Sequence, residues 1–78
     1  MVDLKKTLEN IAKAVVDDPN EVVVTEKIDG TTVTLELTVA PDDMGKVIGK
    51  QGRIAKSIRS IMKAAASTSG QKVIVDIR

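Results

Sequence analysis

Hydrophobic residues recur every three or four positions near the start of the chain, with charged residues between them. The apolar stripe consists of Leu4, Leu8, Ile11, Ala12 and Val15. This spacing is typical of an amphipathic helix. Asp3 is a suitable N-cap, and the segment 17–20, which contains a proline, is a strong helix terminator. The pattern therefore predicts a helix over residues 3–16.

An alternation of apolar and polar residues follows, on either side of the dipeptide Asp29-Gly30. Such a dipeptide suits the two-residue turn of a β-hairpin. With this turn, Val24 lies opposite Leu35 and Glu26 lies opposite Val33. The register places most apolar residues on one face of the hairpin and most polar residues on the other, and a slip of one residue would mix the two faces.

Helical spacing returns on both sides of a glycine-containing turn in the second half of the chain. Pro41 ends the second strand, and Asp42 or Asp43 is placed to cap a short helix over about 42–48. A longer helix is predicted over about 53–66. The expected buried stripe of this longer helix comprises Ile54, Ile58, Ile61, Met62 and Ala65.

A final strand is predicted from the alternation of Val73, Val75 and Ile77. The order of elements is then helix, strand, strand, helix, turn, helix, strand. This order predicts an α+β fold in which helices pack on one face of a three-stranded sheet. The 78 residues suit one small domain over residues 1–78.

The composition excludes several classes of function. The chain has no cysteine, no histidine and no aromatic residue, so disulfides, thiolate sites, the usual general base and aromatic base-stacking platforms are absent. The pair Asp42-Asp43 offers oxygen ligands to a hard cation, but helix capping explains it more simply. We expect a non-catalytic protein without cofactor or metal. No signal peptide or 20-residue apolar run is present, so we expect a cytoplasmic protein.

The charges divide sharply along the sequence. Residues 1–44 carry a net charge of −6 and residues 45–78 carry a net charge of +7, although the whole chain is nearly neutral. Six basic residues and no acidic one lie between Gly45 and Ala66. A polyanion would be attracted to one part of the molecule and repelled by the other. A pair of ordinary solvated faces is the alternative interpretation of this division.

The glycines of Gly49-Lys50-Gln51-Gly52 lie at the start of the basic helix. The spacing fits neither the Walker A loop nor the dinucleotide-binding fingerprint. A turn that opens a helix presents unpaired N–H groups and the positive end of the helix dipole. Glycines there let a sugar–phosphate backbone come close, and Lys46, Lys50 and Arg53 supply positive charge nearby.

The segment VIGKQG, residues 47–52, matches the VIGxxG core of the KH domain, and the order of elements resembles the bacterial type II form of that fold over essentially the whole chain. The length and the segment DMGKVIGKQGRIAKSIR resemble the stand-alone KH-domain RNA-binding proteins of the KhpA type. One position departs from the KH consensus, because Ala55 stands where an isoleucine is usual and Ile54 precedes it.

This resemblance implies a single-stranded RNA-binding protein that acts as a post-transcriptional regulator or RNA chaperone and clamps about four nucleotides at the GxxG loop. Carried over by position, the RNA-binding residues would be Lys46, Ile48, Gly49, Lys50, Gln51, Gly52, Arg53, Ile54 and Lys56. Single-stranded DNA is an alternative ligand, because KH folds hold it too. The resemblance also implies a homodimer or a heterodimer with a KhpB-like KH-containing protein. A protein-interaction module with incidental nucleic-acid binding is the alternative function.

Overall fold

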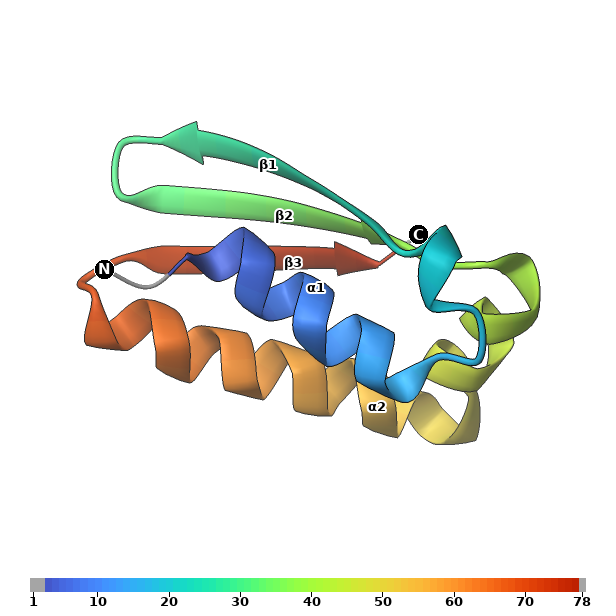
Figure 1. Cartoon of the computed structure of the whole chain (residues 1–78). Coiled ribbons are helices and arrows are strands. Elements are labelled where there is room, and N and C mark those ends of the chain that lie inside the picture. The colour runs from blue at the N-terminus through green and yellow to red at the C-terminus, as the bar shows by residue number, and fades with distance from the viewer. Residues whose placement is uncertain (1–2, 78) are drawn as a thin grey trace.

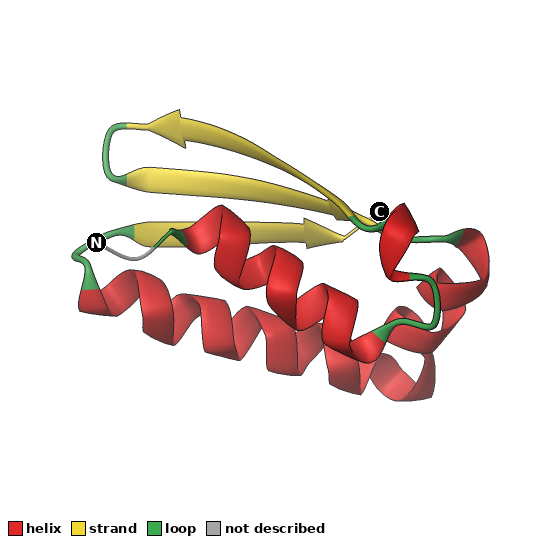
Figure 2. Ribbon diagram, in the orientation of Figure 1, coloured by secondary structure: helices red, strands yellow, loops and turns green. Residues whose placement is uncertain are grey.

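The computed structural model describes residues 3–77, apart from the side chains of residues 50 and 51. Its elements are α1 (Leu4–Val15), the 3₁₀ turn η1 (Pro19–Glu21), β1 (Val23–Asp29), β2 (Thr32–Thr38), α2 (Pro41–Thr68) and β3 (Lys72–Ile77). The strands form one sheet in the order β1-β2-β3, in which β1 and β2 are antiparallel and β2 and β3 are parallel. Both helices cover the same face of the sheet (Figures 1 and 2). The predicted α+β architecture is confirmed.

Helix α1 begins and ends close to the predicted positions. Asp3 is its N-cap, and the Asp3 carboxylate accepts a hydrogen bond of 3.1 Å from the backbone N–H of Lys6. This bond satisfies one of the donors that a helix leaves unpaired at its N-terminus. The buried side of the helix is formed by Leu4, Leu8 and Ala12. The periodicity therefore predicted both the helix and the side that packs against the rest of the protein.

The hairpin has its expected faces, but the predicted register is wrong. Val24 pairs with Leu37, and the last pair before the turn is Asp29 with Thr32, so the turn residues are Gly30 and Thr31 rather than Asp29 and Gly30. Gly30 has a φ of 62°, which suits the first position of the mirror-image turns found in hairpins. The change moves each β1 residue by two positions along β2, and a shift of two keeps every side chain on its face.

The prediction of two separate helices around the glycine turn also needs correction. The helical segment is continuous from Pro41 to Thr68, but Gly52 has a φ of 70°, outside the right-handed helical region. A straight helix of 28 residues would measure about 42 Å, whereas the longest dimension of the molecule is 34 Å. Figure 1 shows α2 changing direction between its yellow-green and orange parts. In the described part of the chain, no helix is long and apolar enough to cross a membrane.

The core lies between the helices and the central strand β2, whose buried residues are Val33, Leu35 and Leu37. The side of α2 that faces the sheet differs from the predicted stripe. Its buried residues in the second half of the helix are Ala55, Ile58, Met62 and Ala66. Ile61 is 48% exposed, and Ile54 and Ala65 are partly buried. Two alanines thus belong to the buried side, whereas Ile54 and Ile61 lie toward α1.

The predicted capping role of Asp42 or Asp43 is wrong. Ala40 is the N-cap of α2, without a side-chain hydrogen bond, and Pro41 occupies the first turn. Pro41 suits this place because the first turn of a helix has N–H groups without intrahelical partners. Asp43 is instead buried, and its carboxylate accepts hydrogen bonds from the segment that follows α1.

Candidate nucleic-acid interface

A groove lies beside the bend in α2, where the second half of that helix passes the end of β3. It is lined by Ile48, Gly52, Ala55, Lys56, Arg59 and Ile77, and its volume is ≈ 360 Å³. We call it the GKQG groove. The bend brings the end of the first half of α2, the start of its second half and the last residues of β3 to one place.

The lining of the GKQG groove combines aliphatic and basic side chains. Ala55 is buried and Ile77 is partly buried, whereas Ile48 is 49% exposed. Lys56 and Arg59 are exposed on the same wall, one helical turn apart. No carboxylate lines the groove among the described residues. An aliphatic surface beside two cations can pack against the faces of bases and neutralise phosphates.

Gly52 is required at the bend by its backbone conformation. A side chain is strongly disfavoured at a φ of 70°, where Cβ would crowd the carbonyl oxygen. A Cβ at Gly52 or Gly49 would meet no heavy atom within 4 Å, so both glycines face open space. The backbone there is accessible to an approaching molecule. The side chains of the predicted binding residues Lys50 and Gln51 lie outside the described residues.

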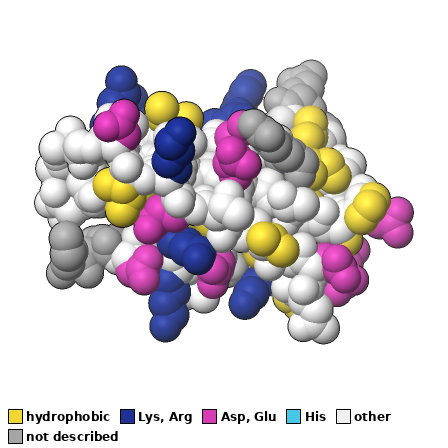
Figure 3. Space-filling view, turned by 90° about the horizontal axis from the view of Figure 1, so that it is seen from above, with side chains coloured by type: hydrophobic (Ala, Val, Ile, Leu, Met, Phe, Trp, Pro, Cys, Tyr) yellow, Lys and Arg dark blue, Asp and Glu magenta, His cyan; other side chains and the backbone are white. Residues whose placement is uncertain are grey.

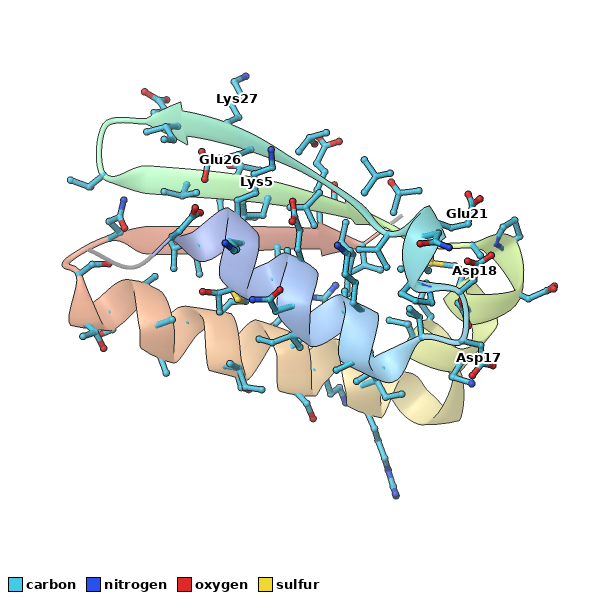
Figure 4. All side chains as sticks on the ribbon, in the orientation of Figure 1. Lys5, Asp17, Asp18, Glu21, Glu26 and Lys27 are labelled. Carbon is cyan, nitrogen blue, oxygen red and sulfur yellow. The ribbon has the colours of Figure 1, made fainter. Side chains whose placement is uncertain are left out.

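Lys46 is directed away from the GKQG groove by an ion pair. Its Nζ lies 2.6 Å from a carboxylate oxygen of Asp17. The hydrogen bond to Asp17 raises the pKa of Lys46 above its ordinary value, and the charge of nearby Asp43 acts in the same direction. Figure 4 shows Asp17 and Asp18 beside the first turns of α2. The predicted phosphate contact from Lys46 would have to compete with this ion pair.

Arg53 and Ile54 line a different groove, between α1 and α2. This second groove has a volume of ≈ 200 Å³ and is lined by Ile11, Val15, Arg53, Ile54, Ser57, Ile58 and Ile61. We call it the α1–α2 groove. The structure thus places the nine predicted residues in four groups: Ile48, Gly52 and Lys56 in the GKQG groove, Arg53 and Ile54 in the α1–α2 groove, Lys46 at Asp17, and Gly49, Lys50 and Gln51 along the bend.

Three residues of the GKQG groove were not among those predicted. Ala55 occupies the consensus position three residues after the second glycine, so motif spacing could have identified it. Arg59 lies outside the glycine motif, but its spacing of three from Lys56 places both residues on one side of the helix. Ile77 comes from β3, and its place in the groove depends on how that strand packs against α2.

Comparisons with known proteins identify relatives of the whole domain. The model of the family described as KhpA/KhpB, KH domain, matches residues 5–77. The RNA-binding protein KhpA of Clostridium acetobutylicum is 57% identical over 74 residues, which cover 95% of this chain and 99% of the relative. KhpA of Clostridium perfringens is 54% identical over the same shares. KhpA of Caldanaerobacter subterraneus is 54% identical over 77 residues, 99% of each chain.

Two solved structures share the fold. A crystal structure of Era in complex with MgGDPNP and nucleotides 1506–1542 of 16S ribosomal RNA has a TM-score of 0.69 and 15% identity, over 95% of this chain and 28% of the other. A crystal structure of a single-residue variant of Aquifex aeolicus Era, bound to GDP.AlF4-, has a TM-score of 0.68 and 15% identity, over 95% of this chain and 29% of the other. At this identity the likeness shows the fold alone.

Proposed function

This chain belongs to the KhpA/KhpB KH-domain family, and on that premise we propose that it is a non-catalytic, single-stranded RNA-binding protein of the cytoplasm. In this proposal the GKQG turn, residues 49–52, holds the RNA backbone and the GKQG groove receives the bases. Its cellular role would be that of a post-transcriptional regulator or RNA chaperone. Single-stranded DNA would compete for the same groove, because neither an aliphatic wall nor a phosphate contact requires the 2′-hydroxyl.

The observation that supports this proposal is the composition of the GKQG groove. Gly52 exposes its backbone at one end, Lys56 and Arg59 provide positive charge along one wall, and Ala55 and Ile77 provide an apolar floor. Single-stranded nucleic acid presents the complementary features, which are a regular row of phosphates and flat apolar bases. The KhpA relatives carry the name RNA-binding protein.

We expect the binding of one domain to be weak and sensitive to salt. A KH domain clamps about four nucleotides, so the contact area is small. With about three phosphates neutralised, the logarithm of the binding constant should fall with the logarithm of salt concentration at a slope of about −2. A binding constant that does not change with salt would contradict the phosphate contacts.

The test is a two-dimensional amide NMR titration of the isotope-labelled protein with four-nucleotide RNA of randomised sequence. We expect the largest shifts at residues 49–52 and at Lys56, Arg59 and Ile77, because these line or adjoin the groove. The double variant Lys50→Asp, Gln51→Asp should abolish these shifts while keeping a folded spectrum.

A matched control separates the effect of the turn from that of net charge. The variant Lys5→Asp, Asn10→Asp changes the net charge equally, but both positions are exposed on α1. This control should keep the shifts at residues 49–52. If the control loses binding as the turn variant does, or if shifts appear on β1 instead, the proposed clamp is wrong.

We propose association with a second KH-containing chain as an additional function, supported by the α1–α2 groove. Ile11, Val15 and Ile54 give this groove an apolar lining, and Ile61 on its rim is 48% exposed. The partner would be a second copy of this chain or a KhpB-like protein. Association would join two weak RNA sites and increase the affinity for a strand that reaches both.

Sedimentation of the protein alone tests the association of two copies. We expect a concentration-dependent dimer that the variant Ile61→Glu converts to a monomer. Ile28→Glu is the matched control, because Ile28 is 61% exposed and lies at the end of β1, outside the α1–α2 groove. A monomer at all concentrations, or equal effects of the two variants, would exclude self-association through this groove.

A further inference from the structure

Two further hollows lie beyond the GKQG groove, between the second half of α2 and β3. The nearer hollow has a volume of ≈ 340 Å³ and is lined by Arg59, Lys63, Val73, Ile74 and Val75. The farther hollow has a volume of ≈ 410 Å³ and is lined by Lys63, Ser67, Gln71, Lys72 and Val73. Neither hollow belongs to the four-nucleotide site proposed above.

The three hollows are consecutive parts of one groove. Arg59 lines both the GKQG groove and the nearer hollow, and Lys63 and Val73 line both further hollows. Along the groove, the helix residues ascend from 52 to 67 while the strand residues descend from 77 to 72. A helix and a strand that run in opposite directions therefore form its two walls. We call the whole channel the α2–β3 groove.

Positive charge lines the whole length of the α2–β3 groove. Lys56, Arg59 and Lys63 are spaced by three and four residues, which places them on one side of α2. Lys72 stands at the far end, on β3. In the described part of the chain, no carboxylate lines any of the three hollows. By contrast, Figure 3, which views the molecule from above, shows acidic and basic side chains intermixed.

The far end of the α2–β3 groove is held in place by hydrogen bonds. The backbone N–H of Lys72 donates to the carbonyl oxygen of Thr31, in the hairpin turn, at 2.9 Å. The backbone N–H of Gln71 donates to the carbonyl oxygen of Ala66 at 2.9 Å, and the Ser69 hydroxyl lies 3.0 Å from Oε1 of Gln71. These bonds fix the loop between α2 and β3, so the Lys72 backbone has a defined position relative to the helix.

We propose that the α2–β3 groove extends the RNA site beyond the four-nucleotide clamp, with Lys63 and Lys72 neutralising phosphates of the following nucleotides. This inference rests on the proposed RNA-binding function. Lys63 lies about 10 Å beyond Lys56 at the helical rise of about 1.5 Å per residue. Phosphates follow one another at no less than about 3.4 Å along a strand, so the extension has room for two or three nucleotides. Val73 and Ile74 offer aliphatic surface to their bases.

The test compares the binding of labelled four- and eight-nucleotide RNAs of randomised sequence, measured by fluorescence anisotropy over a range of salt concentrations. An eight-nucleotide RNA presents about five overlapping registers to a four-nucleotide site, so a site without extension gains about fivefold in affinity. We expect a larger gain. Two added phosphate contacts should also make the salt slope for the longer RNA steeper by about 1.4.

The double variant Lys63→Gln, Lys72→Gln should reduce the gain with length to about fivefold and remove the difference in salt slope. The matched control is Lys5→Gln, Lys27→Gln, which changes the net charge equally. Lys27 lies on β1, at the opposite edge of the sheet from β3, and Figure 4 shows Lys5 and Lys27 on the side of the molecule away from α2. The control should keep the additional gain.

The outcomes separate this inference from the function on which it rests. A gain of about fivefold with equal salt slopes in the unmodified protein would overturn the extension and leave the four-nucleotide clamp intact. If the control variant lost the additional gain in affinity to the same extent, the extension would also be overturned, because net charge would then explain that gain. A failure of both RNAs to bind would overturn the proposed RNA-binding function and the extension together.

Discussion

The buried carboxylate of Asp43 accepts a hydrogen bond of 2.9 Å from the backbone N–H of Asp17. Its second oxygen accepts one of 3.0 Å from the backbone N–H of Asp18. The first turn of α2 thereby holds the segment between α1 and η1, 26 residues earlier in the chain. Lys46, one turn further along α2, pairs with the side chain of Asp17 and completes the link.

The variant Asp43→Asn should lower the thermal unfolding temperature at neutral pH. The amide of asparagine has one acceptor oxygen, so one of the two backbone N–H groups would face an N–H₂ donor instead. Circular dichroism measures the unfolding temperature. Asp42→Asn is the control, because Asp42 is an exposed neighbour in the same turn. An equal fall in the unfolding temperature of that variant would contradict the role of Asp43.

The same contact predicts a pH dependence. The hydrogen bond from the Asp17 backbone, together with the one from the Asp18 backbone, lowers the pKa of Asp43 below its ordinary value of 3.8. A carboxyl group whose pKa is lower in the folded state binds protons more readily when unfolded, so it stabilises the fold above the unfolded pKa. This contribution is lost as the pH falls through the folded pKa. The difference in unfolding temperature between the unmodified protein and the Asp43→Asn variant should therefore shrink below about pH 3.8. A difference that stays constant with pH would exclude this linkage.

Substitutions of two glycines in α2 should change stability in opposite directions. Gly52→Ala should cost about 1–2 kcal/mol, because alanine is strained at a positive φ. Gly45→Ala should stabilise by about 0.5–1 kcal/mol, because Gly45 lies in regular helix and a Cβ there meets nothing within 4 Å. Urea unfolding of both variants gives the two free energies. If both substitutions raised the free energy of unfolding, Gly52 would have ordinary helical geometry in solution.

Arg59 should matter more for RNA binding than Lys46. Arg59 lines two of the hollows along α2 and β3, whereas Lys46 is paired with Asp17. Each of Arg59→Gln and Lys46→Gln removes one positive charge. We expect Arg59→Gln to weaken binding at every salt concentration and to reduce the salt slope by about 0.7. Lys46→Gln should leave the slope nearly unchanged, and the reverse order would place the RNA on the Asp17 side of α2.

The variant Leu35→Ala should destabilise the domain strongly. Leu35 is fully buried at the centre of β2, and truncation of a buried leucine typically costs about 2–5 kcal/mol. A domain of 78 residues has a total stability of about 4–12 kcal/mol, so this loss is a large share. Ile28→Ala, on an exposed side chain of β1, should cost less than about 1 kcal/mol. If urea unfolding showed equal losses of unfolding free energy for the two variants, the position of the core would be contradicted.

Local patterns in the sequence predicted most of the elements of this fold. The spacing of Leu4 and Leu8 and the cap at Asp3 identify α1 because helix formation and capping depend on neighbours within one or two turns. Alternation in the strands identifies which side chains share a face. The motif at residues 47–52, together with the order of elements, indicated a KH domain, and the family comparison confirmed it.

The register of the hairpin depended on more than alternation. Two registers that differ by two residues place the same side chains on the same face, so the pattern at Val24 and Leu35 does not separate them. In the observed turn, the carbonyl oxygen of Thr31 accepts a hydrogen bond of 2.9 Å from the backbone N–H of Lys72, which lies on β3. A bond between segments so far apart in sequence leaves no local signal.

The amino-acid sequence alone established the faces of α1 and of the strands, the glycine bend and the basic character of α2. How these basic residues are used was settled by tertiary packing. It paired Lys46 with Asp17, turned Arg53 and Ile54 toward α1, and brought Arg59 beside β3. A helical pattern shows which residues share one side of a helix, but the neighbour of that side is set by packing across the whole domain. The groove therefore appears only when α2 and β3 are brought together.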